Sequence, residues 1–431
     1  MSILPVLSKI LERVVNSQLM DFLEKNGILL SNQSGFRGKF STDTCTIDLT
    51  DYVKSEISSG KMVGMTLIDL CKAFDTVNHD ILIEKLAAIG VSSIEWFKSY
   101  LAARSQCVVS SNSQSDFEDI SCGVPQGSIL GPQLFLIYIN DMVVSTTDCK
   151  LSLYADDSAL IFSHTDPAVI ASTLSRELSE CKRWLVDNKL SLHVGKTECI
   201  LFGSPRRLKK VSGFSVSCDG QLVNRVRSVK YLGLLLDENM SGLSHAIDVI
   251  KKCAGRISFF YRHADVLNFK CRKLVCSALI MPYMNYCSSS WYTGLSAKLR
   301  GKLDVLQRRM VRFVFSLAPR SHVGTEKLRE LCWLSVKDTV RFFKLQHVFK
   351  IRFGLAPDYL TTRFQPITSS HSHLTRGSGF NFRVSRDLAR CQSNFAYTAI
   401  TDWNSLPTHL KKCECLPSFR SRLKKHLISF Y

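Results

Sequence analysis

The stretch Leu151-Ser-Leu-Tyr-Ala-Asp-Asp-Ser-Ala-Leu-Ile-Phe162 contains two short apolar runs on either side of an acidic pair. Apolar runs of this kind that flank a polar pair are typical of a β-hairpin, so we expect strands at 151–155 and 158–162. Asp156 and Asp157 then lie at or beside the turn. Two adjacent carboxylates repel each other, and a divalent cation is a natural reason to hold them together. An acidic pair in a turn is also common without such a role.

A third acidic residue, Asp69, ends another apolar run. Residues 62–70 are bounded by Gly60 and by polar residues, which predicts a buried strand. An ionised carboxylate there is unfavourable unless a cation or a hydrogen-bond donor partners it. The three aspartates together resemble a phosphoryl-transfer site, where Mg²⁺ binds few protein carboxylates and completes its shell with substrate phosphates. Two such ions about 4 Å apart can activate a 3′-hydroxyl and stabilise the leaving pyrophosphate.

Helical and strand-like patterns alternate around these aspartates. The expected helices cover residues 3–24, 42–57, 93–103, 129–142 and 169–188, and Asn78 is expected to cap another. Further short strands are expected at 108–110, 117–121, 191–193 and 199–202. Strands interleaved with helices over roughly the first 235 residues indicate an α/β or α+β sheet domain. Beyond residue 233 the pattern becomes mainly helical and basic.

Composition limits the class of protein. The chain has 431 residues, 45% of them hydrophobic, which suits two or three globular domains. No run is apolar for long enough to cross a bilayer, and the first residues do not form a signal-peptide core. We therefore expect an intracellular protein, nuclear or cytoplasmic, that is not secreted and has no membrane segment. Nothing in the sequence sets its oligomeric state.

The 16 cysteines are scattered along the chain, and in a reducing compartment they are expected to be free thiols. Cys413 and Cys415 are the closest pair, but no second pair stands at the spacing of a zinc finger. A structural zinc site formed by Cys391, Cys413, Cys415 and a nearby histidine is a minor alternative.

The net charge of +19 is distributed unevenly. Residues 1–204 carry 17 Lys and Arg against 24 Asp and Glu, whereas residues 205–431 carry 39 against 13. A half of the chain that is so basic indicates a polyanionic partner, and we favour nucleic acid over a membrane surface. Solubility alone would not require charge on one side only.

Six segments in order resemble the motifs of a known family. Leu67-Ile-Asp-Leu-Cys-Lys-Ala-Phe-Asp-Thr-Val77, Gly123-Val-Pro-Gln-Gly-Ser-Ile-Leu-Gly-Pro132 and Tyr154-Ala-Asp-Asp157 are similar to the palm motifs of LINE-type, non-LTR retrotransposon reverse transcriptases. Gln33-Ser-Gly-Phe-Arg-Gly-Lys-Phe-Ser-Thr42 is similar to their fingers motif, and residues 192–197 and 229–233 to their last palm motifs. Residues 354–359 and 403–407 look like the tail of these elements.

The resemblance implies an α+β, right-hand polymerase fold with partial fingers, a palm, a helical thumb and a basic C-terminal extension. It implies a fingers and palm domain at residues 1–236, a helical thumb-like region at 237–320 and a basic C-terminal region at 321–431. The implied activity is RNA-directed DNA polymerisation, with transfer from dNTPs to a primer 3′-hydroxyl. Its implied partners are an RNA template and a DNA primer, and its cofactor is Mg²⁺, for which Mn²⁺ can substitute.

The resemblance also implies a role for the acidic residues. Asp69 and Asp156 would bind the metal ions, and Asp157 would adjoin them. Leu70 would contribute a backbone carbonyl. Lys196 matches a position that can protonate or contact the leaving pyrophosphate, although an isolated lysine is ordinarily a solvated surface residue.

Further residues match positions that contact the incoming nucleotide. Phe74 matches the aromatic residue that excludes a 2′-hydroxyl, although a core aromatic is the alternative. Gln126 and Gly127 lie in a turn whose glycine lets the backbone approach the nucleotide. Arg37 is a candidate triphosphate contact, because guanidinium binds phosphate oxygens in bidentate fashion.

Arg308, Arg309 and Arg312 are expected to contact nucleic-acid phosphates, and a solvated helix face is the alternative.

The chain departs from the family at three points. Phe40 stands where a basic residue or histidine is frequent, although Lys39 is adjacent. The endonuclease that normally precedes the polymerase is absent, and the chain begins inside the first fingers segment. We therefore expect a 5′-truncated element. Two alternatives remain, a catalytically weak remnant that only binds nucleic acid and a protein similar to group II intron maturases.

Overall fold

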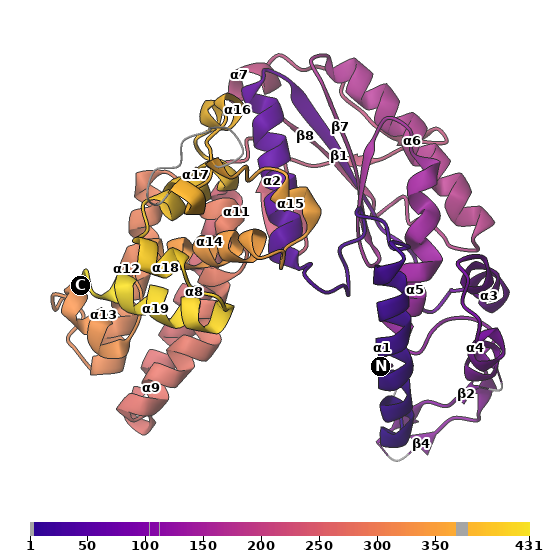
Figure 1. The fold of residues 1–431 in the computed structure, drawn as a ribbon, viewed down its shortest axis with the longest axis horizontal. Helices are drawn as coiled ribbons and strands as arrows, with labels where there is room; N and C mark the ends of the chain where they lie inside the picture. The colour runs from indigo at the N-terminus through magenta and orange to yellow at the C-terminus, as the bar shows by residue number, and fades with distance from the viewer. Residues whose placement is uncertain (1–3, 103, 112, 368–377) are drawn as a thin grey trace. The chain divides into compact units, whose positions relative to one another are not determined.

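The computed structural model describes residues 4–102, 104–111, 113–367 and 378–431. The chain divides into two compact units (Figure 1). The sheet unit comprises residues 1–38, 63–201 and 211–226, and the helical unit comprises residues 39–62, 202–210 and 227–431.

A five-stranded sheet forms the centre of the sheet unit. Its order is β11 (Asn224–Arg225), β8 (Glu198–Phe202), β1 (Met62–Ile68), β7 (Asp157–His164) and β6 (Lys150–Tyr154). β11 is parallel to β8, whereas β7 and β6 form an antiparallel pair. β1 is buried along almost its whole length, as its apolar sequence predicts, and it lies directly beside β7.

The predicted hairpin is confirmed, with a shift in its turn. Tyr154 pairs with Asp157, so the turn consists of Ala155 and Asp156, and Asp157 begins β7. Ala155 has a φ of 55°, a left-handed conformation that is unfavourable for a residue with a Cβ atom.

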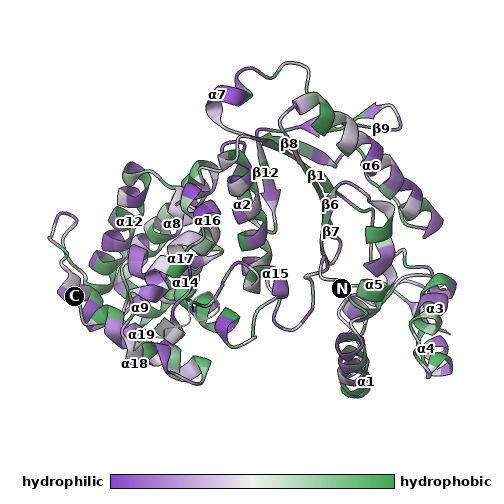
Figure 2. Ribbon diagram, turned by 45° about the horizontal axis from the view of Figure 1, so that its top comes forward, coloured by the Kyte–Doolittle hydropathy of each residue, from purple (hydrophilic) through white to green (hydrophobic). Residues whose placement is uncertain are grey.

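Helices cover the sheet and extend from it. They are α1 (Val6–Lys25), α3 (His79–Ala88), α4 (Ile94–Leu101), α5 (Gly131–Ile139) and α6 (Pro167–Asp187). α5 is almost wholly buried and its ribbon is largely green in Figure 2. The expected helix at 129–142 is thus α5, followed by the 3-10 helix η1 (Asn140–Ser145). α6 packs against β7, and its N-terminus is capped by Asp166, which accepts a hydrogen bond from the Ala168 N–H.

The strands expected at 108–110 and 117–121 do not pair with each other. β3 (Val109–Ser110) pairs with β4 (Ser113–Gln114), and β2 (Ser105–Gln106) pairs with β5 (Glu118–Asp119). The polar segment between the two predicted strands therefore contains a strand of its own. Another short hairpin of this unit joins β9 (Ser217–Cys218) to β10 (Gln221–Leu222).

The helical unit begins with α2 (Thr42–Ser58). Its other described elements come later in the chain, and those after the first of them follow residue 227. They are α7 (Pro205–Leu208), the hairpin β12 (Ser228–Tyr231) and β13 (Leu234–Asp237), α8 (Leu243–Arg262), α9 (Phe269–Val275), the π-helix η3 (Cys276–Ile280), α10 (Met281–Asn285), α11 (Ser288–Trp291), α12 (Ala297–Phe315), α13 (Thr325–Leu331), α14 (Val336–Arg352), α15 (Asp358–Thr361), α16 (Arg386–Arg390), α17 (Phe395–Asn404), α18 (Thr408–Lys411) and α19 (Leu416–Ile428). The 3-10 turns η2 (Ala264–Val266), η4 (Tyr292–Gly294) and η6 (Ser378–Phe380) lie between these elements in the described part of the unit.

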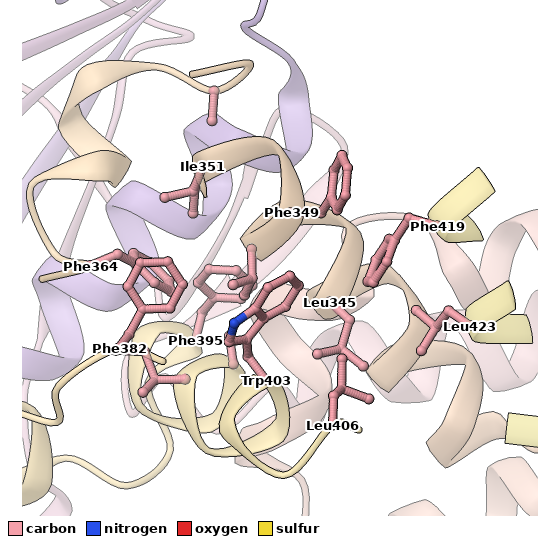
Figure 3. Packing of buried hydrophobic residues seen from close by; sticks show 14 of the residues in the cluster. Leu345, Phe349, Ile351, Phe364, Phe382, Phe395, Trp403, Leu406, Phe419 and Leu423 are labelled. Atoms are coloured by element: carbon pink, nitrogen blue, oxygen red, sulfur yellow. The ribbon is translucent and has the colours of Figure 1, made fainter. Parts of the chain in front are cut away.

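The last third of the chain has a hydrophobic core, shown in Figure 3, to which α14, α17 and α19 contribute. Phe349 stacks on Phe419 with ring centroids 4.7 Å apart. Trp403 is fully buried, and its indole N–H donates to the carbonyl of Phe380 at 2.8 Å. Ile47 of α2 belongs to the same core, so the C-terminal region folds together with a helix from the start of the chain.

Hydrogen bonds to a buried carboxylate strengthen this association of α2. The Asp51 carboxylate accepts hydrogen bonds from the N–H groups of Phe395, at 2.6 Å, and Ala396, at 2.9 Å, at the start of α17. Arg363 pairs with Asp48 and approaches Asp51 to 3.6 Å. The domain boundaries expected at residues 236 and 320 remain predictions from composition and resemblance. The compact helical unit is defined by contacts such as these, and it therefore includes α2.

Candidate active site

Three aspartates come from two neighbouring strands of the sheet unit. Asp69 follows the end of β1, and Asp156 and Asp157 lie at the β6–β7 turn. Burial raises the pKa of Asp157, and the negative charges of Asp156 and Asp69 raise it further. The three carboxyl groups therefore lie close enough to interact, as the sequence led us to expect, and the site favours a positive charge.

The backbone after Asp69 is held by the segment that follows α6. The N–H of Cys71 donates to the carbonyl of Ser191 at 2.9 Å, and the N–H of His193 donates to the carbonyl of Asp69 at 2.8 Å. These bonds flank the antiparallel pair Leu70 and Leu192. In such a pair the N–H and C=O of the central residue point away from the partner strand, so this pairing leaves the Leu70 carbonyl uncommitted.

Lys196 lies in the turn that follows this pairing. Its N–H donates to the carbonyl of His193 at 3.0 Å, and its side chain is exposed. The turn is thus tied to the backbone of Asp69 through His193. The backbone role of His193 was not expected from the sequence, because it depends on pairing and not on the imidazole.

The segments 67–77 and 123–132 are joined by their backbones. The N–H of Val124 donates to the carbonyl of Phe74 at 2.8 Å. The ring of Phe74 stacks on the ring of Phe135 of α5, with centroids 4.5 Å apart. Gly123 has a φ of 88°, and a Cβ atom there would lie 2.7 Å from the Asp75 carbonyl oxygen. Only glycine fits this close approach.

The turn that contains Gln126 and Gly127 is exposed. The Gln126 side-chain amide donates to the Asp75 carboxylate at 2.9 Å. Gly127 has a φ of 101°, which favours glycine. The turn is therefore anchored to the segment that follows Asp69 while its outer surface stays open.

Arg37 is committed to contacts within the protein. Its guanidinium binds both carboxylate oxygens of Glu24 at 2.9 Å and donates to the carbonyls of Leu30, at 2.7 Å, and Gln33, at 3.0 Å. Only 7% of its side chain is exposed. A triphosphate would have to displace Glu24, so these contacts do not favour the predicted phosphate contact.

The three arginines of α12, in the helical unit, have different environments. Arg309 donates to the Ser258 hydroxyl at 3.0 Å, and Arg312 donates to the Ser321 carbonyl at 2.8 Å. Arg308 is exposed. Arg309 and Arg312 thus join elements of the helical unit, and Arg308 retains the expected orientation toward solvent.

Sequence reasoning also missed a role for Gln33, although it begins the quoted fingers motif. Its side chain is fully buried, and its amide oxygen accepts hydrogen bonds from the N–H groups of Gly35 and Ala155. A glutamine at the start of a polar loop offers only a weak signal, because most such residues are solvated.

Among the residues that the structure describes, no three His, Cys, Asp or Glu side chains are grouped so as to hold a metal ion by themselves. Cys391, Cys413 and Cys415 are among these residues, and all three are free thiols. The aspartates nevertheless fit a divalent cation that is bound jointly with a substrate. Mg²⁺ in such sites takes one or two carboxylates and completes its shell with phosphate oxygens and water.

None of the described helices combines the length and the apolar character that a membrane span requires.

Residues 1–236 match the family described as reverse transcriptase (RNA-dependent DNA polymerase). The chain is 28% identical over 357 residues to the probable RNA-directed DNA polymerase from transposon BS of Drosophila melanogaster, covering 79% of this chain and 38% of that protein. It is 25% identical over 323 residues to the RNA-directed DNA polymerase from mobile element jockey of Drosophila funebris, covering 72% and 35%. The chain thus spans little more than a third of the length of these curated relatives.

Among solved structures, the chain is similar to telomerase from Candida tropicalis in complex with a TWJ fragment of telomeric RNA. The sequence identity is 13% and the TM-score is 0.43, and the similarity covers 99% of this chain and 57% of that one.

The resemblance to reverse transcriptases of non-LTR retrotransposons is confirmed by these relatives. The expected α+β, right-hand polymerase fold is confirmed by the family match and agrees with the mixed sheet and its helices. The matched residues make up more than half of the chain and include all three aspartates. The chain therefore belongs to the reverse transcriptase family.

Proposed function

We propose that this chain synthesises DNA on an RNA template by transferring nucleotides from dNTPs to a primer 3′-hydroxyl. The observation that carries the proposal is the convergence of Asp69 with Asp156 and Asp157 from the adjacent strands β1 and β7. The names of the two insect relatives, both RNA-directed DNA polymerases, support the same activity.

Asp69 and Asp156 are the proposed metal ligands, with Asp157 beside them. The uncommitted carbonyl of Leu70 provides a third oxygen donor. Mg²⁺, or Mn²⁺ in its place, would supply the charge that activates the 3′-hydroxyl and neutralises the leaving pyrophosphate. Carboxylate and carbonyl oxygens are the donors that these ions prefer. Burial raises the pKa of Asp157, and the negative charges of Asp156 and Asp69 raise it further, so the proximity of the three carboxyl groups supports this assignment.

The proposed nucleotide site lies around Phe74, Gln126 and Gly127. Phe74 is supported from behind by Phe135, so its ring can hold a fixed position beneath the sugar and exclude a 2′-hydroxyl. Gln126 and the positive-φ backbone at Gly127 offer contacts to the nucleotide and template from an exposed turn. Lys196 would contact or protonate the leaving pyrophosphate from the turn tied to Asp69.

The basic half of the chain is proposed to hold the template–primer duplex through its phosphates. Residues 1–236 would serve as fingers and palm, residues 237–320 as a thumb, and residues 321–431 as a C-terminal region packed on α2. Arg308 is the best candidate of the three arginines for a phosphate contact, because its side chain is exposed. Binding of this kind weakens steeply as salt is raised.

The test is Mg²⁺-dependent extension of a DNA primer on an RNA template. Asp156→Ala is expected to abolish extension, because it removes a proposed metal ligand. Asp187→Ala is the matched control, since Asp187 is an exposed aspartate at the end of α6 in the same unit. It is expected to extend the primer as the parent does.

Three results would contradict the proposal. Extension that survives Asp156→Ala would refute the assignment of Asp156. A parent chain that binds the duplex without extending the primer would favour a nucleic-acid-binding remnant. Splicing of a group II intron would favour a maturase-like protein.

A further inference from the structure

We propose that residues 32–35 form a clamp that fixes the catalytic turn, and that Gln33 and Arg37 are positioning residues of the polymerase. The inference rests on the proposed function, because the turn it fixes carries Asp156. The clamp, Arg37 and the catalytic turn all belong to the sheet unit.

The clamp begins as an added strand. β6 is an edge strand of the five-stranded sheet, and Gln33 pairs with Leu153 of β6 in parallel. The N–H of Leu153 donates to the Asn32 carbonyl at 2.9 Å, and the N–H of Ser34 donates to the Leu153 carbonyl at 2.8 Å. The Asn32 side-chain amide donates to the Leu151 carbonyl at 2.7 Å. The segment therefore satisfies backbone groups that an open edge would leave unpaired.

The side chain of Gln33 extends this pairing into the turn. Its amide oxygen accepts the N–H of Gly35 at 2.8 Å and the N–H of Ala155 at 3.1 Å. Ala155 precedes Asp156 and has the unfavourable φ of 55°. A hydrogen bond to its N–H favours this left-handed conformation over the alternatives, and that conformation sets the direction of the Asp156 side chain.

Gly35 brings the clamp into direct contact with the turn. A Cβ atom at this position would lie 2.5 Å from the Ala155 nitrogen and 3.1 Å from the Tyr154 carbonyl carbon. Both of these are backbone atoms, which cannot move aside as a flexible side chain can. The two backbones therefore pack against each other, and Gly35 has to be a glycine for the turn to keep its shape.

Arg37 holds the clamp from the other side. It donates to the Gln33 and Leu30 carbonyls, and its bidentate pair with Glu24 ties the loop to α1. A buried guanidinium that joins two carbonyls to a carboxylate orders the loop that presents Gln33. These contacts account for the burial of the Arg37 side chain, of which only 7% is exposed.

Gln33→Met tests these hydrogen bonds selectively, because methionine has nearly the same length and volume as glutamine but lacks the amide oxygen that accepts them. Gln33→Met is expected to lower kcat for primer extension about 10- to 100-fold, since small displacements of a catalytic group have effects of this size. It is also expected to raise the Mg²⁺ concentration at half-maximal rate about fivefold or more, because a displaced Asp156 binds metal less well. The KM for dNTP is expected to stay near its parental value, whereas the thermal midpoint is expected to fall, because the buried N–H groups of Gly35 and Ala155 lose their acceptor.

The control is Gln346→Met in the helical unit. Gln346 is also buried, and within the described part of the chain its amide donates to the carbonyl of Phe342 in its own helix. It is expected to leave kcat and the Mg²⁺ requirement unchanged. Gln33→Glu keeps the acceptor but adds a buried charge near three aspartates, and it is expected to be as poor as Gln33→Met.

A second measurement does not depend on activity. Hydrogen exchange of the Ala155 amide, followed by mass spectrometry on the full chain, is expected to quicken about tenfold in Gln33→Met and not in Gln346→Met. Unchanged exchange at Ala155 would overturn the inference even in a chain that does not extend primers. The inference would also be overturned, with the proposed function intact, if the parent and Gln33→Met were both fully active and Asp156→Ala were inactive.

Discussion

The Asp51 carboxylate joins α2 to α17, so the stability of the helical unit is sensitive to its substitution. It lies on α2, is 3% exposed, and accepts two N–H groups at the start of α17. Burial raises its pKa, against the lowering effects of Arg363, Lys54 and the two N–H donors. The hydrogen bonds therefore stabilise this unit, whereas the buried charge itself is unfavourable.

The contribution of the hydrogen bonds and the cost of the buried charge can be separated by substitution. Asp51→Ala leaves two buried N–H groups without an acceptor, and we expect it to lower the free energy of unfolding by about 3–5 kcal/mol. Asp51→Asn retains one acceptor and removes the desolvated charge, so we expect a loss of about 1–2 kcal/mol. Arg363 keeps its pairing with Asp48 in both variants.

The assay is guanidinium unfolding followed by circular dichroism and tryptophan fluorescence. Asp387→Ala is the control, because the side chain of Asp387 is 84% exposed and its one ion pair is with Arg390 on the same helix. This control is expected to lie within about 0.5 kcal/mol of the parent. An Asp51→Ala variant that unfolds within 1 kcal/mol of the parent, about the error of such comparisons, would refute the reasoning.

Two further predictions concern pH and substrate selection. Burial lowers the pKa of His245 to about 4. The unfolded chain takes up a proton near pH 6.5 and the folded chain does not, so stability falls by up to about 3 kcal/mol between pH 6.5 and 4. His245→Asn, which keeps an acceptor for the Leu235 N–H, should reduce this slope in urea unfolding. Part of the slope should remain, because burial also lowers the pKa of His347. An unchanged slope would contradict the prediction. Phe74→Val should raise ribonucleotide incorporation relative to deoxyribonucleotide incorporation about tenfold or more in primer extension, and an unchanged ratio would count against the sugar contact.

Much of the sheet unit was predictable, because its signals are local. The alternation around Asp156 and Asp157 predicted the hairpin, and the apolar run before Asp69 predicted β1. The amphipathic pattern at 169–188 predicted α6 to within two residues at its start and one at its end. The exact turn was not predictable, because the left-handed conformation of Ala155 is held by a segment more than a hundred residues earlier.

Long-range partners account for the remaining differences. A charged residue in an amphipathic helix is ordinarily assigned to solvent, yet Asp48, Asp51 and Lys54 of α2 are buried. Their partners lie beyond residue 289, and periodicity carries no information about them. Arg37 was assigned to a phosphate because guanidinium suits phosphates, but Glu24 offers the same bidentate geometry within the protein.

The burial of α2 against the end of the chain has a consequence for biosynthesis. Asp51 leaves the ribosome 345 residues before Ala396, which donates a hydrogen bond to it. At about 5–20 residues per second, α2 waits roughly 20–70 s for its partners. During that interval its apolar and charged surface needs protection by chaperones. If translation ended early in the last hundred codons, the released chain would still contain the catalytic turn. Its helical unit would lack the partners of α2 and could not form its core.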